Sequence, residues 1–261
     1  MQNDFNIYSF RSSDGNMVKL EYRQSLPSTM ALAQKYAQMG YPDRYTVFAE
    51  KQTAFSALGA PLTDGESEQG IFLSCILRPS LFPSQASFIG PLSALTLTLA
   101  LEEHTTKKIG IGWKSNIFCE GVKIGCVEID EKKDSPASYE YLIVNFAIRL
   151  DEKNFPPRLT DMVRQVFEED CVSIPMIMAK TVLNKFFSIY TELKSPAKHL
   201  NSYANKFALT DKKITYLENG KKKSAKVIGI NKDDLTLNIE TRDGRKINVS
   251  SISSVTIPNK I

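Results

Sequence analysis

The sequence predicts an α+β protein, in which a mixed sheet with flanking helices is followed by a small all-β barrel. Two observations lead to this division. Strand and helix patterns alternate up to about residue 150 and helical patterns follow, whereas beyond residue 204 apolar residues recur with a period of two. We therefore expect a larger domain over residues 1–204 and a smaller one over residues 205–261. The length of 261 residues and the hydrophobic content of 42% suffice for one sizeable core and a small second domain.

Polar caps, turns and apolar spacing define the elements of the first half. Ser28 and Thr29 are natural N-caps for a helix that begins there. Leucines at helical spacing predict a helix over residues 84–103. Glu120-Gly121-Val122 indicates the turn of a hairpin.

The second half is predicted to be helical first and to end in short strands. One helix follows Pro156-Pro157, and another covers residues 176–193 with apolar residues along one face. Ser195-Pro196 ends the latter, and a shorter helix runs to about Asn205. Turn sequences then separate five short strands, as in a small barrel, over residues 213–217, 226–230, 235–239, 246–249 and 254–257.

Charge is unevenly distributed between the two predicted domains. Residues 205–261 carry 12 Lys and Arg against 6 Asp and Glu, a net of +6, which leaves −2 for the rest of a chain with a total of +4. Nucleic-acid sites interleave such charge with stacking aromatic residues, and only Tyr216 lies near Lys221-Lys222-Lys223. A solvated hairpin turn is therefore the favoured interpretation, and attraction to an acidic partner surface is the alternative.

Composition disfavours several functional classes. The four cysteines form no Cys-x-x-Cys pair and the chain has two histidines, so no metal site is expected. No run of about 18 apolar residues predicts a membrane span. The N-terminal residues lack the basic and apolar segments of a secretory signal. We expect an intracellular protein of the reducing cytoplasm, with an organelle as the alternative location.

The segment Ala49-Glu50-Lys51-Gln52-Thr53 resembles a motif of the biotin protein ligases. In that family, Ala-Glu-x-Gln-Thr leads into a Gly-Arg-Gly-Arg-x-Gly loop that folds over biotin and its adenylate. The resemblance implies that Gln52 and Thr53 bind substrate. Ser56 and Leu58 occupy the two arginine positions, so this loop lacks fixed positive charge for a phosphate.

Two further blocks match the family more in scaffold than in chemistry. Ser28 and Thr29 are similar to its Ser-Thr-Asn turn, which implies a substrate-binding role, while Met30 replaces the asparagine. The helix N-cap is the alternative explanation for that pair. In the block Gly112-Trp113-Lys114-Ser115-Asn116, which stands where the family has Lys-Trp-Pro-Asn-Asp, only Trp113 is kept. Gly112 and Asn116 replace the lysine and the aspartate.

The strand that begins at Lys123 is similar to the family strand that carries the catalytic lysine. The resemblance implies that Lys123 bridges the substrate carboxylate and the adenylate phosphate, and that Gly125 lies beside the substrate. A solvated lysine at a hairpin turn is the alternative. In the next matching strand, Asn145 and Ala147 replace two glycines and add bulk in the expected cleft. Arg149, at an asparagine position, is either a new anion contact or an edge-strand charge.

The C-terminal strands resemble the SH3-like domain of bacterial biotin protein ligases. The resemblance therefore implies a biotin/lipoate ligase-like domain followed by an SH3-like barrel. No segment before Gln24 is long enough for the winged-helix domain of the repressor-type ligases, so no DNA-binding domain is expected.

Two hypotheses of function follow from this pattern. The favoured one is a degenerate adenylation site on a fold kept as a non-catalytic binding or structural module, with a protein partner or a second copy of the chain. The alternative is an ATP-dependent ligase that attaches biotin or lipoate, through an adenylate, to a lysine of an acceptor domain. That enzyme would need ATP, Mg and biotin, with Arg149 or Lys114 replacing the lost charges.

Overall fold

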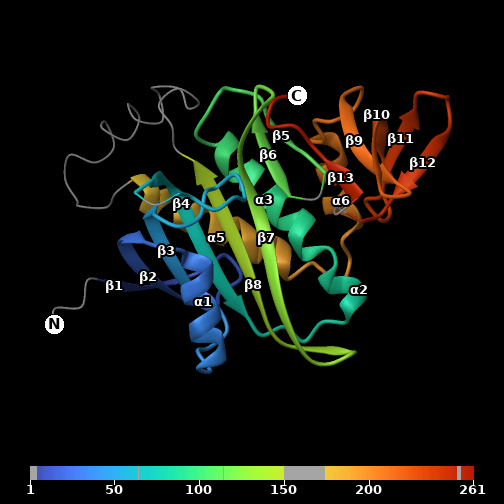
Figure 1. Ribbon diagram of the computed structural model, residues 1–261. Helices are drawn as coiled ribbons and strands as arrows, with labels where there is room; N and C mark the ends of the chain where they lie inside the picture. Colours follow the sequence, from blue (N-terminus) through green and yellow to red (C-terminus); the bar gives the residue numbers. More distant parts are fainter. Residues whose placement is uncertain (1–4, 64, 114, 150–173, 252–253) are drawn as a thin grey trace.

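Two β-sheets form the protein, and one is much larger than the other (Figure 1). The computed structural model describes residues 5–63, 65–113, 115–149, 174–251 and 254–261. The large sheet contains β1 (Asn6–Arg11), β2 (Met17–Leu26), β3 (Tyr45–Gln52), β4 (Glu68–Leu77), β5 (Ile109–Ile111), β6 (Asn116–Cys119), β7 (Val122–Ser135) and β8 (Ser138–Arg149). Its order is β1-β2-β3-β4-β8-β7-β6-β5, with β2 and β3 parallel and the other neighbours antiparallel.

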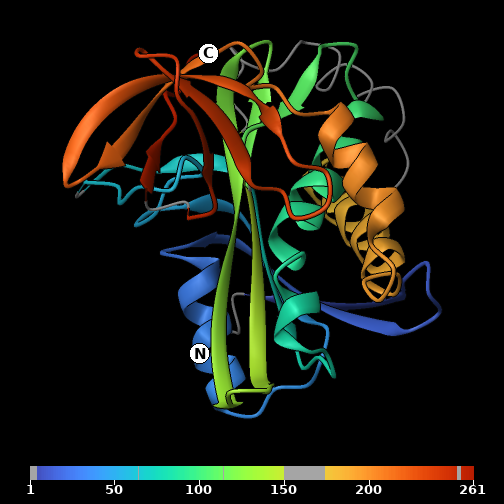
Figure 2. The same cartoon turned by 90° about the vertical axis from the view of Figure 1, so that its right-hand side faces the viewer.

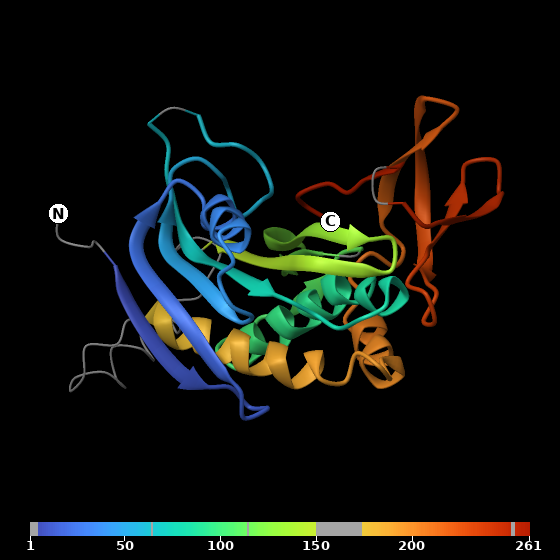
Figure 3. The same cartoon turned by 90° about the horizontal axis from the view of Figure 1, so that it is seen from below.

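Helices cover the two faces of this sheet unequally. They are α1 (Thr29–Gln38), α2 (Pro83–Ala86), α3 (Ile89–Glu102), α5 (Ile174–Tyr190) and α6 (Ala197–Asn205). The main core lies on one face, beneath α3 and α5, while α1 packs on the other (Figure 3). Because strand side chains alternate, Phe48 faces the main core and its neighbour Val47 faces α1. We call the face that carries Val47 the front face.

The predicted long helix over residues 84–103 is observed as two helices, α2 and α3. By length and composition alone, the segment Pro83–Glu102 is long and apolar enough to cross a membrane. Within this segment, 61% of the most apolar stretch is buried inside the protein. The helix is apolar all round because the sheet and α5 cover it on opposite sides.

The helical segment is confirmed where it is described. Residues 174–190 form α5 and residues 197–205 form α6, close to the predicted spans. The helix expected after Pro156-Pro157 lies outside the described residues.

The second sheet is antiparallel and consists of the C-terminal strands (Figure 2). They are β9 (Lys213–Glu218), β10 (Lys221–Ile230), β11 (Leu237–Thr241), β12 (Lys246–Val249) and β13 (Val255–Thr256), in the order β12-β11-β10-β9-β13. The turn at Asn219-Gly220 has positive φ at both residues, 51° and 73°, as a tight hairpin requires. The α+β class with a second all-β unit is therefore confirmed, while the boundary at residue 204 stays a prediction.

Candidate functional site

The candidate site lies on the front face, where β4, β8 and β7 are neighbours. The strand register brings two rows of side chains together across these strands. In the first row Ser74, Asn145 and Glu128 are opposite one another. In the second row the opposing residues are Phe72, Ala147 and Cys126. The two positions where the family resemblance has glycine, 145 and 147, are thus the centres of the two rows.

A buried network of polar side chains occupies the first row. Ser74 Oγ lies 2.9 Å from both Thr29 Oγ1 and Asn145 Oδ1. Gln52 Oε1 accepts a hydrogen bond from the Thr29 backbone N–H at 2.8 Å. Asn145 Nδ2 donates to Glu128 Oε2 at 3.1 Å. Because buried polar groups are costly without partners, this network satisfies the site from within the chain.

The loop between β3 and β4 covers the second row. Gln52 begins the loop and its Nε2 donates to the Phe55 carbonyl at 2.8 Å. A turn follows, in which the Gly59 N–H donates to the Ser56 carbonyl at 3.0 Å and Ser56 Oγ accepts from the Leu58 N–H. Gly59 has a φ of 80°, a conformation that favours glycine. The family's two arginine positions are therefore part of a compact turn.

Ala57 is the innermost residue of that loop. It has no solvent-exposed surface and contacts Phe72 and Ala147. Its N–H donates to Glu68 Oε2 at 2.5 Å, and its carbonyl accepts from the Cys126 thiol at 3.3 Å. A loop residue thus fills the space that the sequence assigned to a substrate.

Arg149 does not face this space as an uncompensated cation. Its Nε lies 3.4 Å from Glu68 Oε1, and the other carboxylate oxygen of Glu68 holds Ala57. The sequence left open an anion contact or an edge-strand charge for Arg149. The structure supports the edge-strand charge, since Arg149 forms an ion pair with Glu68 at a partly exposed strand end.

Lys123 reaches the same loop from β7. Its Nζ donates to the Leu58 carbonyl at 2.8 Å, and its backbone N–H donates to the Asn259 carbonyl at 2.7 Å. A carbonyl oxygen of the chain therefore takes the place that the resemblance gives to an anionic substrate. The alternative of a solvated turn lysine is wrong, because the ammonium is partly buried and bonded.

The cysteines at the site and in the sheet are poor nucleophiles. Burial, with a smaller contribution from Glu128, raises the pKa of Cys126 to about 12. Burial likewise raises the pKa of Cys75 to about 12 and also raises the pKa of Cys119. These thiols stay protonated at neutral pH, and attack requires the thiolate.

Several of the predicted substrate-binding residues have structural roles. Ser28 Oγ caps α1 by accepting from the Ala31 N–H at 3.2 Å, which supports the N-cap explanation. Met30, in the first turn of α1, packs against the core between that helix and the sheet. Thr53 is exposed, and its N–H donates to the Leu26 carbonyl. A Cβ on Gly125 would lie 2.2 Å from the Ala147 carbonyl oxygen, so close strand packing requires this glycine.

The tryptophan block is divided between the site and the C-terminal sheet, because Asn116 is opposite Cys126 of the second row. Trp113 has no exposed surface, belongs to the core of the C-terminal sheet and donates its Nε1–H to the Leu235 carbonyl at 2.8 Å. A Cβ on Gly112 would lie 2.7 Å from the Phe118 ring, and Asn116 begins β6. Trp113 is therefore placed to join the two sheets, and the expectation that it contacts substrate stays a prediction.

The structure brings Thr29, Gln52, Lys123, Ser56 and Leu58 together and leaves Trp113 apart. Sequence reasoning missed Ser74, Glu68 and Glu128 as members of the site. Ser74, as a single polar residue in an otherwise apolar strand, was a signal that could have found one of them. Among the described residues, no group of three or more His, Cys, Asp and Glu side chains could hold a metal ion.

Comparison with known proteins agrees with this architecture. No protein-family model matches the chain. The bifunctional ligase/repressor BirA of Bacillus subtilis and that of Bacillus spizizenii are each 26% identical over 147 residues, which is 55% of this chain and 44% of each relative. The chain thus matches less than half the length of these curated relatives.

Solved structures extend the likeness to most of the chain. Biotin protein ligase from Aquifex aeolicus, in complex with biotin and ATP, has a TM-score of 0.65 at 17% identity, covering 91% of this chain and 97% of that one. A biotin protein ligase-like protein of unknown function from a Silicibacter species has a TM-score of 0.60 at 12% identity, covering 89% and 94%. The fold is therefore that of a biotin protein ligase-like protein with a C-terminal β domain.

Proposed function

We propose that this protein is a non-catalytic binding or structural module built on the biotin protein ligase-like fold. The observation that carries the proposal is Ala57, which is fully buried against Phe72 and Ala147 in the candidate site. A ligand on this part of the front face would have to displace the loop. The two residues that replace family glycines, Asn145 and Ala147, both take part in filling the site.

The bonds that hold the loop support this proposal. Displacing Ala57 and Leu58 breaks their contacts with Glu68, Cys126 and Lys123. Hydrogen bonds to charged groups contribute about 1.5–3 kcal/mol each. A ligand would therefore have to offset the free energy of the loop's broken hydrogen bonds. The loop as folded is a competitor for any substrate.

The charges around the loop also support it. An adenylating site must hold a triphosphate, and the residues present do not fit that group. Ser56 and Leu58 offer no cation, and Glu68 neutralises Arg149. Lys114, the other residue expected to replace lost charge, lies outside the described residues. Loss of one such donor removes about 3 kcal/mol of transition-state stabilisation.

The alternative function is ligation of biotin or lipoate to an acceptor-domain lysine. The similarity to a ligase bound to biotin and ATP favours it. It requires the loop to open and Lys123 to exchange the Leu58 carbonyl for substrate.

Pyrophosphate release distinguishes the two functions. The protein is incubated with ATP, Mg and either biotin or lipoate, and its melting temperature is measured with each ligand alone. We expect no acid-dependent pyrophosphate and no thermal shift. Steady release that is lost in Lys123→Ala would establish the ligase instead, and Lys107→Ala is the matched control because Lys107 pairs with Glu120 away from the loop.

The partner in this proposal is another protein or a second copy of the chain, bound through an edge of the large sheet. Among the described strands, β1 is paired on one side only, and Ile7 and Tyr8 are 53% and 39% exposed. Sedimentation equilibrium measures self-association. Ile7→Lys should weaken a dimer formed at this edge, whereas Lys123→Ala should leave it intact.

A further inference from the structure

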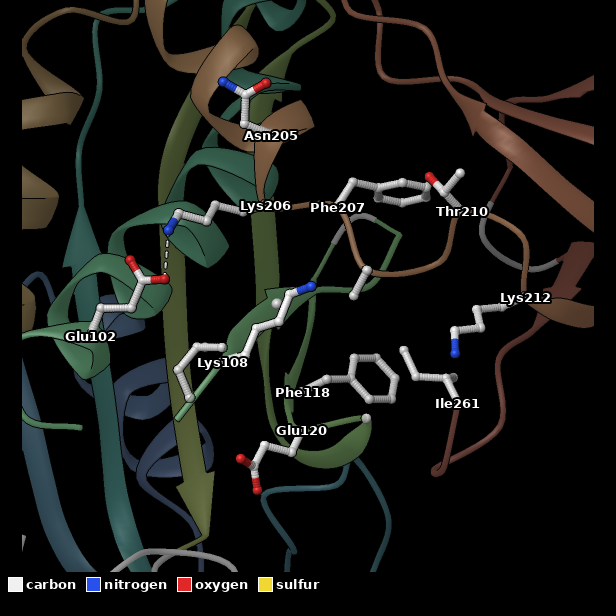
Figure 4. A pocket seen from close by; sticks show the side chains of 14 residues that line it. Glu102, Lys108, Phe118, Glu120, Asn205, Lys206, Phe207, Thr210, Lys212 and Ile261 are labelled. Carbon is white, nitrogen blue, oxygen red and sulfur yellow. Dashed lines mark hydrogen bonds and ion pairs between the residues drawn. The ribbon is translucent and has the colours of Figure 1, made fainter. Parts of the chain in front are cut away.

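A pocket separate from the loop-covered site lies between the two predicted domains, at the opposite edge of the large sheet from β1. It has a volume of about 540 Å³, within the range of ligand pockets. Its walls come from the start of β5, the turn between β6 and β7, the segment after α6, and residues near β9 (Figure 4). We call it the interdomain pocket.

Backbone hydrogen bonds make this pocket a fixed part of the fold. The segment after α6 adds to the sheet, since the Ile111 N–H donates to the Lys206 carbonyl and the Ala208 N–H donates to the Ile111 carbonyl, both at 2.8 Å. The Glu120 N–H donates to the Lys108 carbonyl at 2.9 Å. The walls are therefore formed before any ligand arrives, which lowers the cost of binding.

Three lysines and two glutamates line the pocket. Among its lining residues, Glu102 pairs with Lys206 at 2.6 Å, and Glu120 lies 3.6 Å from Lys107 outside the pocket. Lys108 and Lys212 have no carboxylate within ion-pair distance in the part of the chain that the structure describes. In Figure 4 their ammonium groups approach the hollow from opposite sides. Two such groups favour a ligand that carries negative charge.

Apolar side chains form a further part of the lining, together with the polar Asn205 and Thr210. Phe118, Phe207 and Ile261 line the hollow (Figure 4). Gly110 and Gly121 add backbone without side chains. Aromatic and aliphatic walls bind a ring or another flat apolar body.

A segment of the chain separates this pocket from the loop-covered site. The Ile261 N–H donates to the Gly121 carbonyl at 2.8 Å, and Val122 pairs with Lys260. The Lys123 backbone is bonded to Asn259, while its ammonium reaches the loop. Residues 259–261 therefore stand between the two, and Lys123 does not line the interdomain pocket.

We propose that the interdomain pocket binds a small amphipathic anion, with a phosphate or carboxylate group between Lys108 and Lys212 and a ring-bearing body against Phe118, Phe207 and Ile261. The proposal is independent of the proposed function. It needs neither the loop nor Lys123.

Titration calorimetry with 1-naphthyl phosphate tests the proposal, and inorganic phosphate is the second probe. We expect saturable binding of one naphthyl phosphate per chain, and weaker binding of inorganic phosphate because it lacks the ring. Lys108→Met and Lys212→Met should each raise the dissociation constant roughly fivefold, as expected for one exposed charge contact. Both lysines are exposed, so the variants should keep the native melting temperature.

Two lysine controls make the result specific. Lys35→Met removes an exposed charge on α1, which does not line the pocket, and Lys123→Met removes the lysine of the loop-covered site. Both should bind naphthyl phosphate like the wild type. Absence of saturable binding, or binding unchanged in Lys108→Met and Lys212→Met, would overturn the proposal. Neither result bears on pyrophosphate release, so the two proposals fail separately.

Discussion

The loop-covered site and the interdomain pocket use the same sheet in opposite ways. In the first, the chain supplies Ala57 as an occupant and pairs the nearby charges with one another. In the second, the walls are fixed by backbone bonds, and Lys108 and Lys212 have no carboxylate within ion-pair distance among the described residues. The comparison teaches that residues at a family motif can be bonded within the chain, while lysines that line a pocket elsewhere have no ion-pair partner among the described residues.

The largest effect should come from Trp113, which holds the C-terminal sheet against the large one. Trp113→Ala removes a fully buried indole and its bond to Leu235, so we expect a loss of about 3–5 kcal/mol in the free energy of unfolding. Urea unfolding measures it. Trp113→Phe, which keeps most of the apolar contact, should cost much less, and a loss below about 1 kcal/mol in Trp113→Ala would refute this role. The interdomain pocket should also lose naphthyl phosphate binding.

The next effect concerns the polar network that fills the first site. Asn145→Ala leaves Ser74, Thr29 and Glu128 short of a partner, and we expect a loss of about 1–3 kcal/mol in unfolding free energy. Asn248→Ala, at an exposed strand position, is the control and should change stability by less than about 0.5 kcal/mol. Equal stability of the two variants would show that the network does not hold the site closed.

Opening the loop should expose Cys126. Ala57→Asp places a carboxylate in a buried position whose backbone is bonded to Glu68, and the loop should leave the sheet rather than bury a second carboxylate there. We expect iodoacetamide to modify Cys126 about tenfold faster, which corresponds to about 1.4 kcal/mol in the opening equilibrium. Peptide mass spectrometry gives the rate. Ala60→Asp, on the exposed side of the loop, should leave the rate unchanged.

The smallest effect is a pH dependence. The pKa of Cys126 rises from an ordinary 9.0 to about 12 in the folded protein because of burial and Glu128. A group with a raised folded pKa stabilises the protein below its unfolded pKa, and that stabilisation is lost as pH rises from 9 toward 12. The wild type should therefore lose about 1 kcal/mol more than Cys126→Ala between pH 8 and pH 10. Urea unfolding at each pH measures this difference. If the unfolding free energies of the two proteins changed equally between pH 8 and pH 10, the burial of this thiol would be contradicted.

Local elements were predictable because neighbouring residues determine them. Ser28 caps a helix, and Asn219-Gly220 turns a hairpin, through groups within a few positions. The contacts of the candidate site were not predictable in this way. Thr29 meets Gln52 over 23 positions and Asn145 over 116, and Trp113 meets Leu235 over 122.

By itself, the sequence determined the α+β class, the positions of most strands and helices, and the loss of the arginine charges from the loop. These depend on side-chain period, turn residues and residue identity, which can be read along the chain. Only the tertiary structure decided that Ala57 occupies the site, that Lys123 binds a carbonyl of the same chain, and that Trp113 belongs to the second sheet. The physical reason is that burial and hydrogen bonding are set by strand register and loop packing between residues far apart in sequence.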